Sequence, residues 1–153
     1  MSGLALNIDS IAHESSFLNA GRTIAVVVDV INVYPRKNRE LSRKIVSNNG
    51  LLLAENKPGV SVKPYHFISR DRIQSALSSA VFPIETCING GTMHAVKAAN
   101  KLKIPIFIPD YAKLGYEENS PQLAGMLEVE KRYFAKKFDK SNYDDILRKL
   151  QDD

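Results

Sequence analysis

TIAVVV, residues 23–28, decides the fold that we expect for this chain. It is an unbroken run of β-branched and small apolar side chains, which is typical of a strand covered on both faces in a parallel sheet. Segments with the apolar spacing of helices flank it at 10–20 and 37–47. Gly21 and Gly50 are expected to end these two helices.

Strand-like and helix-like segments alternate along the first two-thirds of the chain. Short apolar runs predict strands at 51–55, 80–84 and 104–109, and longer periodic segments predict helices at 70–78 and 92–102. Strands separated by helices favour a parallel sheet with right-handed crossovers. We therefore expect an α/β doubly wound fold, with helices on both faces of a mostly parallel sheet.

The last third of the chain has a different pattern. A polar segment at 110–120 precedes two helix-like segments, 121–138 and 142–151. The pattern predicts one domain over residues 1–110 and a C-terminal helical extension over residues 111–153.

The composition restricts the class of protein. No apolar run approaches the length of a membrane-spanning helix, and the first residues do not resemble a secretion signal, so we expect no membrane association. The single cysteine, Cys87, excludes an internal disulfide and fits a reducing cytoplasm. Its spacing from His13, His66 and His94 is unlike that of a metal site, so no metal is expected. The formal net charge of +4 is compatible with a polyanionic partner.

The segment KPYHFISRDRIQSALSSA, residues 63–80, gathers cations and aromatic rings before a helical period. If Ser69 is the N-cap, Arg70 and Arg72 lie in the first turn, where the positive end of the helix dipole opposes cations. A bound phosphate would remove this conflict, and neighbouring rings would stack on unpaired bases. The alternative is that an arginine pairs with a carboxylate and Phe67 packs in the core. The candidate phosphate and base contacts are Lys63, Tyr65, His66, Phe67, Arg70 and Arg72.

The turn ETCINGGT, residues 85–92, is a second candidate phosphate site. We expect it at the carboxyl end of a parallel strand, where ligands of open α/β sheets bind. Gly90 and Gly91 would let backbone N–H groups approach a phosphate, and Thr92 would add a hydroxyl. The alternative is a tight turn that merely requires glycine.

The opening residues, MSGLALNID, resemble a glycine-containing turn before a helix. Ser2 and Gly3 would contribute to the same pocket, because the ends of parallel strands lie together. The alternative, which we favour, is a frayed terminus, since the strand and helix that ordinarily precede such a turn are expected to be absent.

Two basic clusters allow two interpretations each. YPRKNRELSRK, residues 34–44, would attract DNA by counterion release, or it forms the solvated face of a helix. KRYFAKKF, residues 131–138, is a DNA-binding arm or an amphipathic helix with its aromatic rings partly buried. We favour the second interpretation of both.

Five stretches together resemble the DprA/Smf family of DNA-processing proteins, and they occur in the family's order. The resemblance implies a Rossmann-like fold that binds single-stranded DNA and helps to load a RecA-type recombinase, as a homodimer, in natural transformation. It implies no catalytic reaction and no cofactor. The stretches are SGLALNIDSIAH (2–13), GRTIAVVVDVINVYPRKNREL (21–41), GLLLAENKPG (50–59), HFISRDRIQSALSSAVFPIE (66–85) and GGTMHAVKAANKLKIPIFIPD (90–110).

The chain departs from the family's pattern at two turns. The family's Arg-Asn-Arg is Arg70-Asp71-Arg72 here, which adds a negative charge, and its Ser-Gly-Ser-type turn is Asn89-Gly90-Gly91-Thr92. Two other hypotheses therefore stay open. One is a Rossmann-like protein that binds or hydrolyses a nucleotide, although the glutamate that follows the glycine-rich turn of such hydrolases is absent. The other is a remnant with a partner-binding role.

Overall fold

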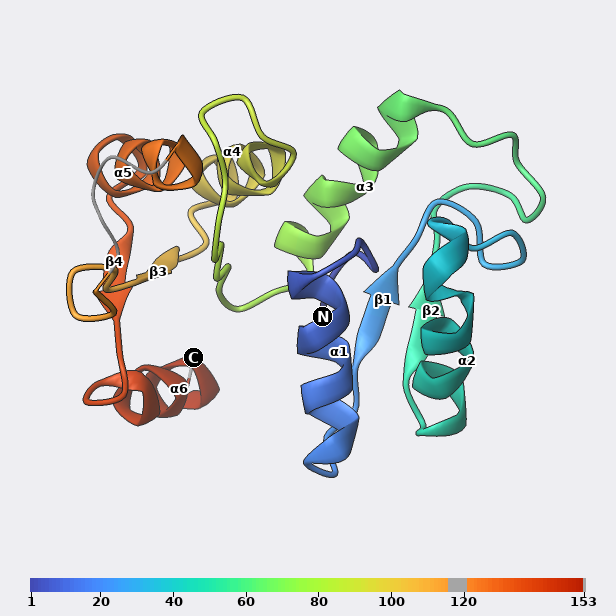
Figure 1. The fold of residues 1–153 in the computed structure, drawn as a ribbon, viewed down its shortest axis with the longest axis horizontal. Helices are drawn as coiled ribbons and strands as arrows, with labels where there is room; N and C mark the ends of the chain where they lie inside the picture. The colour runs from blue at the N-terminus through green and yellow to red at the C-terminus, as the bar shows by residue number, and fades with distance from the viewer. Residues whose placement is uncertain (116–120, 153) are drawn as a thin grey trace. The chain divides into compact units, whose positions relative to one another are not determined.

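The computed structural model describes residues 1–115 and 121–152 of the chain. Its contacts divide the chain into two compact units, Met1–Gln74 and Ser75–Asp153, which we describe one at a time. Helices and short strands alternate in both units (Figure 1), and every strand pair and isolated bridge among the described residues is parallel. The α/β class is therefore confirmed. Within the described residues, no helix is long and apolar enough to cross a membrane.

The first unit is built around β1 (Ile24–Val26), which lies inside the run that predicted it. β1 pairs in parallel with β2 (Leu51–Leu53). On its other side, Ser2 donates its N–H to the carbonyl oxygen of Ile24 at 3.1 Å and accepts from the N–H of Val26 at 2.9 Å. The expectation of a frayed terminus is therefore wrong, because the first residues are hydrogen-bonded to β1 as an additional neighbour.

Helices cover this small sheet. α1 (Ile8–Leu18) and α2 (Arg39–Ser47) contact each other, and the short 3-10 helix η1 (Arg36–Asn38) leads into α2. α3 (Pro64–Ala76) follows β2. The core consists of apolar side chains from the opening residues, from β1 and the loop after it, and from α2: Leu4, Ala25, Val27, Val33, Leu41 and Ile45.

The second unit has the same kind of architecture. β3 (Phe107–Pro109) pairs in parallel with β4 (Lys136–Phe138) on one side, and Ile106 forms a parallel bridge with Val81 on the other. α4 (Thr92–Leu102) contacts α5 (Pro121–Tyr133), and α6 (Tyr143–Asp152) follows β4. The core joins both halves of the unit through Met93, Val96, Ala99, Ile106, Ile108, Leu123, Met126 and Val129.

The prediction of a single helix over 121–138 is wrong. α5 ends at Tyr133, and Phe134 has a φ of 52°, a left-handed conformation that stops the helix and turns the chain into β4. β3 and β4 pair across the predicted domain boundary at residue 110, so residues on both sides of it build one core. The division at 110 remains a prediction about domains, whereas the contacts divide the chain after Gln74.

Gly125 brings α5 into direct contact with the turn before α4. A Cβ atom at this position would lie 2.3 Å from the carbonyl oxygen of Thr86 and 2.6 Å from the carbonyl carbon of Cys87. Both atoms belong to the backbone and cannot move aside as the end of a flexible side chain would. The absence of a side chain at Gly125 is therefore what lets α5 pack here.

Gly125→Ala is expected to lower the free energy of unfolding by about 1–3 kcal/mol, because overpacking against backbone outweighs the better helix propensity of alanine. Urea unfolding measures the change. The matched control is Gly91→Ala, whose Cβ would meet nothing within 4 Å and whose φ of −56° suits alanine. Equal stability of the two variants would contradict the close packing at Gly125.

Candidate nucleic-acid interface

α3 begins earlier than its sequence predicts. Pro64 is its first residue, and the N–H of Lys63 donates to Nδ1 of His66 at 3.1 Å, as in a capping box. Ser69 lies inside the helix, where its hydroxyl donates to the carbonyl oxygen of His66 at 3.0 Å. The prediction that Arg70 and Arg72 lie in the first turn is therefore wrong. Of the predicted cations, only Lys63 adjoins the positive end of the helix.

Arg70 is a buried residue, with an exposed fraction of 9 %. Its Nη1 donates to the main-chain carbonyl oxygens of Gly3 and Val26, so it ties α3 to the first residues and to the end of β1. A Cβ at Gly3 would lie 2.7 Å from the guanidinium, so a side chain at this position would displace the end of Arg70. The guanidinium also lies over the ring of Phe67, 5.6 Å from its centre. Arg70 thus holds the first unit together around its side chain.

The two residues after Arg70 have different surroundings. Burial raises the pKa of Asp71 to about 6, although Arg70 Nε, 3.7 Å from its Oδ1, acts in the opposite direction. Burial likewise lowers the pKa of Arg70. Arg72 is exposed, and its Nη2 lies 2.5 Å from Oε1 of Glu55. Such an exposed ion pair contributes little to stability, so Arg72 can exchange this carboxylate for another anion.

Aromatic rings gather at the start of α3 and in the loop before η1. The rings of Tyr34 and Phe67 are 5.7 Å apart, and those of Tyr65 and His66 are 4.3 Å apart. Tyr34 and Tyr65 remain 53 % and 57 % exposed, whereas His66 is buried. We call these four residues the aromatic cluster. Sequence reasoning missed Tyr34, and its only signal was its place at the start of the basic segment.

Two buried polar side chains hold the loops that carry this cluster. Burial alone would raise the pKa of Asp29, but hydrogen bonds from the N–H groups of Ile31 and Gly59 and from the side chain of Asn32 lower it overall. Asp29 thereby joins the loops that follow β1 and β2. Asn38 donates at 2.9 Å to the carbonyl oxygen of Leu4, which anchors η1 on the opening residues.

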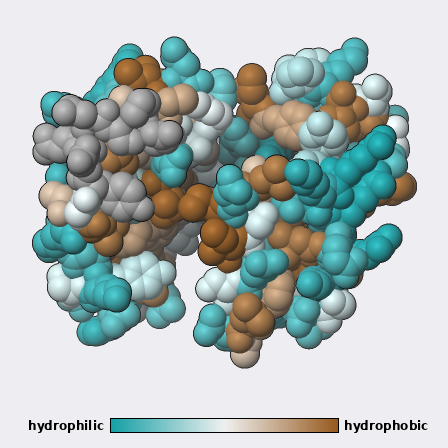
Figure 2. All heavy atoms as spheres, in the orientation of Figure 1, coloured by the Kyte–Doolittle hydropathy of each residue, from teal (hydrophilic) through white to brown (hydrophobic). Residues whose placement is uncertain are grey.

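Cations surround the aromatic cluster. Arg36 and Lys37 follow the loop of Tyr34, and Lys63 precedes α3; all three are exposed. Among the described residues, no carboxylate lies within ion-pair distance of these three side chains. Figure 2 shows hydrophilic side chains gathered over α2, the helix that follows Arg36 and Lys37 in the chain. Exposed rings beside unpaired cations are the combination that binds single-stranded nucleic acids.

The turn at 85–92 belongs to the second unit. The N–H of Gly90 donates to the carbonyl oxygen of Cys87 at 2.9 Å, and a Cβ at Gly90 would lie 2.3 Å from Oγ1 of Thr86. A side chain at Gly90 would therefore displace the hydroxyl of Thr86 and lie 3.1 Å from the carbonyl oxygen of Cys87. Gly91 is exposed, and Thr92 is the first residue of α4 without capping it through its side chain.

The remaining candidates of the first unit have structural partners. The hydroxyl of Ser2 donates to Oδ1 of Asp9 at 2.7 Å, and Gly3 is buried beneath Arg70. Burial lowers the pKa of His13 to about 4, and its Nδ1 lies 2.8 Å from Oγ1 of Thr23. Within the part of the chain that the structure describes, no group of His, Cys, Asp or Glu residues is placed to hold a metal ion.

The raised pKa of Asp71 predicts a pH-dependent stability. Between about pH 4 and pH 6 the folded chain holds a proton that the unfolded chain has released, so stability falls as the pH rises through this range. Asparagine does not titrate, so Asp71→Asn abolishes this pH dependence. The free energy of unfolding of the variant, relative to that of the original chain, should therefore rise by up to about 3 kcal/mol between pH 4 and pH 7.5. Urea unfolding at both pH values measures it.

Asp144→Asn makes the same chemical change at an exposed residue and serves as the control. A difference between Asp71→Asn and the original chain that is constant with pH would show that Asp71 does not titrate in this range.

Comparison with known proteins gives the family. The family model described as DNA recombination-mediator protein A matches residues 1–151, and so extends beyond the five stretches that carried the resemblance. Protein Smf of Borreliella burgdorferi is 30 % identical over 111 residues, which cover 72 % of this chain and 35 % of that protein. DNA processing protein DprA of Streptococcus pneumoniae is 36 % identical over 94 residues, which cover 61 % and 33 %.

Two solved structures of DprA proteins have folds similar to that of this chain. DprA of Streptococcus pneumoniae has a TM-score of 0.78 at 26 % identity and covers 90 % of this chain and 46 % of that one. DprA of Helicobacter pylori, whose structure concerns its binding of single-stranded DNA, has a TM-score of 0.82 at 26 % identity and covers 97 % and 65 %. The chain spans about a third of the length of the curated relatives it matches. It belongs to the family of DNA recombination-mediator protein A.

Proposed function

We propose that this chain binds single-stranded DNA through the aromatic cluster and the cations around it. The observation that carries the proposal is the exposed Tyr34, held against Phe67, which in turn contacts the buried Arg70. The Helicobacter pylori relative binds single-stranded DNA, which supports the same ligand here.

The aromatic cluster supplies the contacts to bases. Tyr34 and Tyr65 offer exposed ring faces, and stacking tolerates any base because every base has a π-face. The ring of Phe67 packs against that of Tyr34. His66 fixes the start of α3 by accepting a hydrogen bond from the N–H of Lys63. Binding by stacking requires unpaired bases, so a single strand should be preferred to a duplex.

The exposed cations supply the contacts to phosphates. Lys63 adjoins the N-terminus of α3, where the helix dipole also attracts an anion. Arg72 also contacts a phosphate, which replaces the carboxylate of Glu55 in its exposed ion pair. Arg70 acts indirectly, because its guanidinium is occupied by the main chain and positions Phe67. Gly91 and Thr92 are proposed as a further phosphate contact, since the space around Gly91 is open.

The wider role follows from the family. The description of the family as a DNA recombination mediator supports the partners that the resemblance implies, so we propose a RecA-type recombinase and a second copy of the chain as protein partners. We propose a binding protein without a catalytic step, and a cytoplasmic location that suits the free, exposed Cys87.

Replacement of the exposed tyrosines tests the base contacts. Tyr34→Ala and Tyr65→Ala should each weaken binding of a labelled oligo-dT about 5- to 150-fold, which corresponds to the loss of one stacked base. Fluorescence anisotropy measures the affinity. Tyr143→Ala removes a partly exposed ring from α6 in the second unit and is the matched control. Unchanged affinity in both test variants would contradict the assigned base contacts.

Salt dependence tests the phosphate contacts. Lys63→Gln should reduce the slope of log affinity against log salt concentration by about 0.7, the contribution of one phosphate contact to a single strand. Titrations at several salt concentrations measure it. Lys149→Gln changes an exposed lysine on α6 in the same way and should leave the slope unaltered. If both variants change the slope equally, the effect of Lys63 is one of net charge only.

A further inference from the structure

A groove lies in the second unit, at the amino ends of β3 and β4. Its volume is about 260 Å³. The turn from α4 to β3 and the turn from α5 to β4 form its walls, because the residues that line it are Asn100, Lys103, Ile104, Pro105, Ile106, Tyr133, Phe134 and Lys136. Ligands of open α/β sheets bind at the carboxyl ends of the strands, so this groove is separate from that position.

Phe134 is the most unusual residue of the groove. Its side chain is 83 % exposed, so the fold gains little from its apolar ring. Its φ of 52° is rare for a bulky residue, and glycine would adopt it without strain. The left-handed backbone thus ends α5 and also holds a large aromatic ring in solvent, where the ring is free to stack on a ligand.

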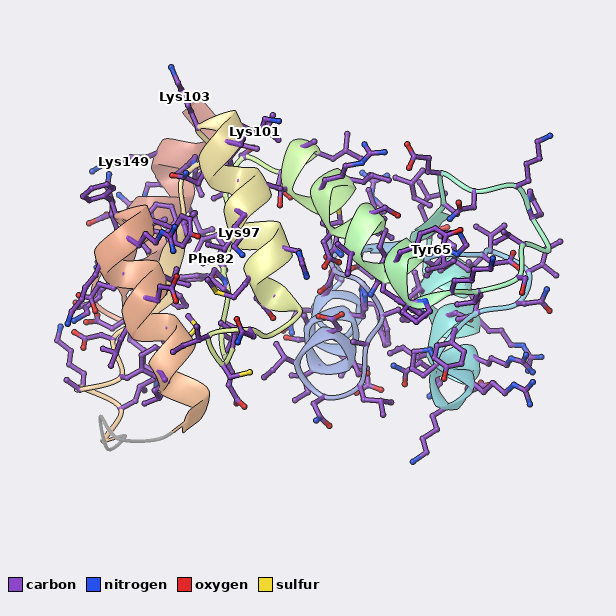
Figure 3. All side chains as sticks on the ribbon, turned by 90° about the horizontal axis from the view of Figure 1, so that it is seen from above. Tyr65, Phe82, Lys97, Lys101, Lys103 and Lys149 are labelled. Carbon is purple, nitrogen blue, oxygen red and sulfur yellow. The ribbon has the colours of Figure 1, made fainter. Side chains whose placement is uncertain are left out.

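The groove is rimmed by lysines without partners. Lys103 and Lys136 line the groove. Lys97 and Lys101 lie on α4, which ends just before Lys103 (Figure 3). Within residues 1–115 and 121–152, no carboxylate lies within ion-pair distance of these four lysines. The neighbouring cations do form ion pairs: Arg132 pairs with Glu128, and Lys137 pairs with Glu130. Both glutamates of α5 are therefore already paired and do not neutralise the lysines of the groove.

We propose that this groove binds a second stretch of single-stranded nucleic acid. A base stacks on Phe134 over the apolar floor of Ile104 and Pro105, and phosphates on either side contact Lys103 and Lys136. The positive charge of the lysines favours an anionic ligand. The exposed ring of Phe134 favours an anion that carries planar aromatic groups, as a nucleic acid does. An acidic peptide would satisfy the lysines but would leave Phe134 without a stacking partner.

The chain contains no tryptophan, which makes a direct test possible. Phe134→Trp keeps an aromatic ring in the groove and provides a single fluorophore. Its emission should fall on titration with oligo-dT as a base stacks on the indole, and a duplex of the same length should leave it largely unchanged. The control is Leu18→Trp, which places a tryptophan at a residue of α1 that is 77 % exposed. An emission of Phe134→Trp that stays constant, or changes only as in the control, overturns the proposal.

One double substitution separates this groove from the aromatic cluster. In the Phe134→Trp background, Tyr34→Ala with Tyr65→Ala weakens the first site, and the quenching should persist. If quenching persists while the two tyrosine substitutions have no effect on affinity, the groove stands and the proposed function of the aromatic cluster fails. Quenching by poly-glutamate but not by oligo-dT would assign the groove to an acidic protein partner instead.

The lysines are tested by charge removal. Lys103→Gln with Lys136→Gln should reduce the slope of log affinity for oligo-dT against log salt by about 1.4, since two phosphate contacts are lost. Lys140→Gln with Lys149→Gln removes the same charge from exposed residues outside the groove. Equal slopes in the two double variants would contradict a phosphate contact at the groove.

Discussion

The buried guanidinium of Arg70 is the interaction on which the first unit depends. Burial of a cation is costly unless hydrogen bonds and nearby charge compensate it. Here the carbonyl oxygens of Gly3 and Val26 accept from Nη1, and Asp71 lies close by. One side chain therefore fixes the opening residues, the end of β1 and α3 relative to one another. Asn38 then anchors η1 on the same opening residues.

The sequence predicts the elements that follow from periodicity. The β-branched run before Asp29 contains β1, and the spacing of apolar residues places α4 close to its observed bounds, although Thr92 is the first helical residue rather than the cap. The start of α3 could not be predicted in this way, because the residue before its first turn is Lys63 rather than a Ser, Thr, Asp or Asn. The side chain that accepts from the N–H of Lys63 is the imidazole of His66 rather than the Glu or Gln of a capping box. The end of α5 was missed because Phe134, not a glycine, adopts the left-handed conformation.

The candidate site was only partly predictable for a similar reason. The segment around Lys63 and Tyr65 is recognisable from its local composition, whereas Tyr34 becomes part of the site only through its contact with Phe67, which is distant in sequence. Burial decides the role of Arg70, and burial depends on the tertiary structure. An arginine that the sequence suggests as a phosphate ligand is thus buried against the main chain and an aromatic ring, and we propose that the exposed residues around it contact DNA.

The most direct test of the account is a titration of the unmodified chain with labelled oligo-dT and with a duplex of equal length, at several salt concentrations. The aromatic cluster and its cations predict a single strand bound more tightly than the duplex, with an affinity that falls linearly with salt on logarithmic axes. Equal affinity for both would contradict base stacking on the aromatic cluster, and no binding at low salt would contradict single-stranded DNA binding by this chain.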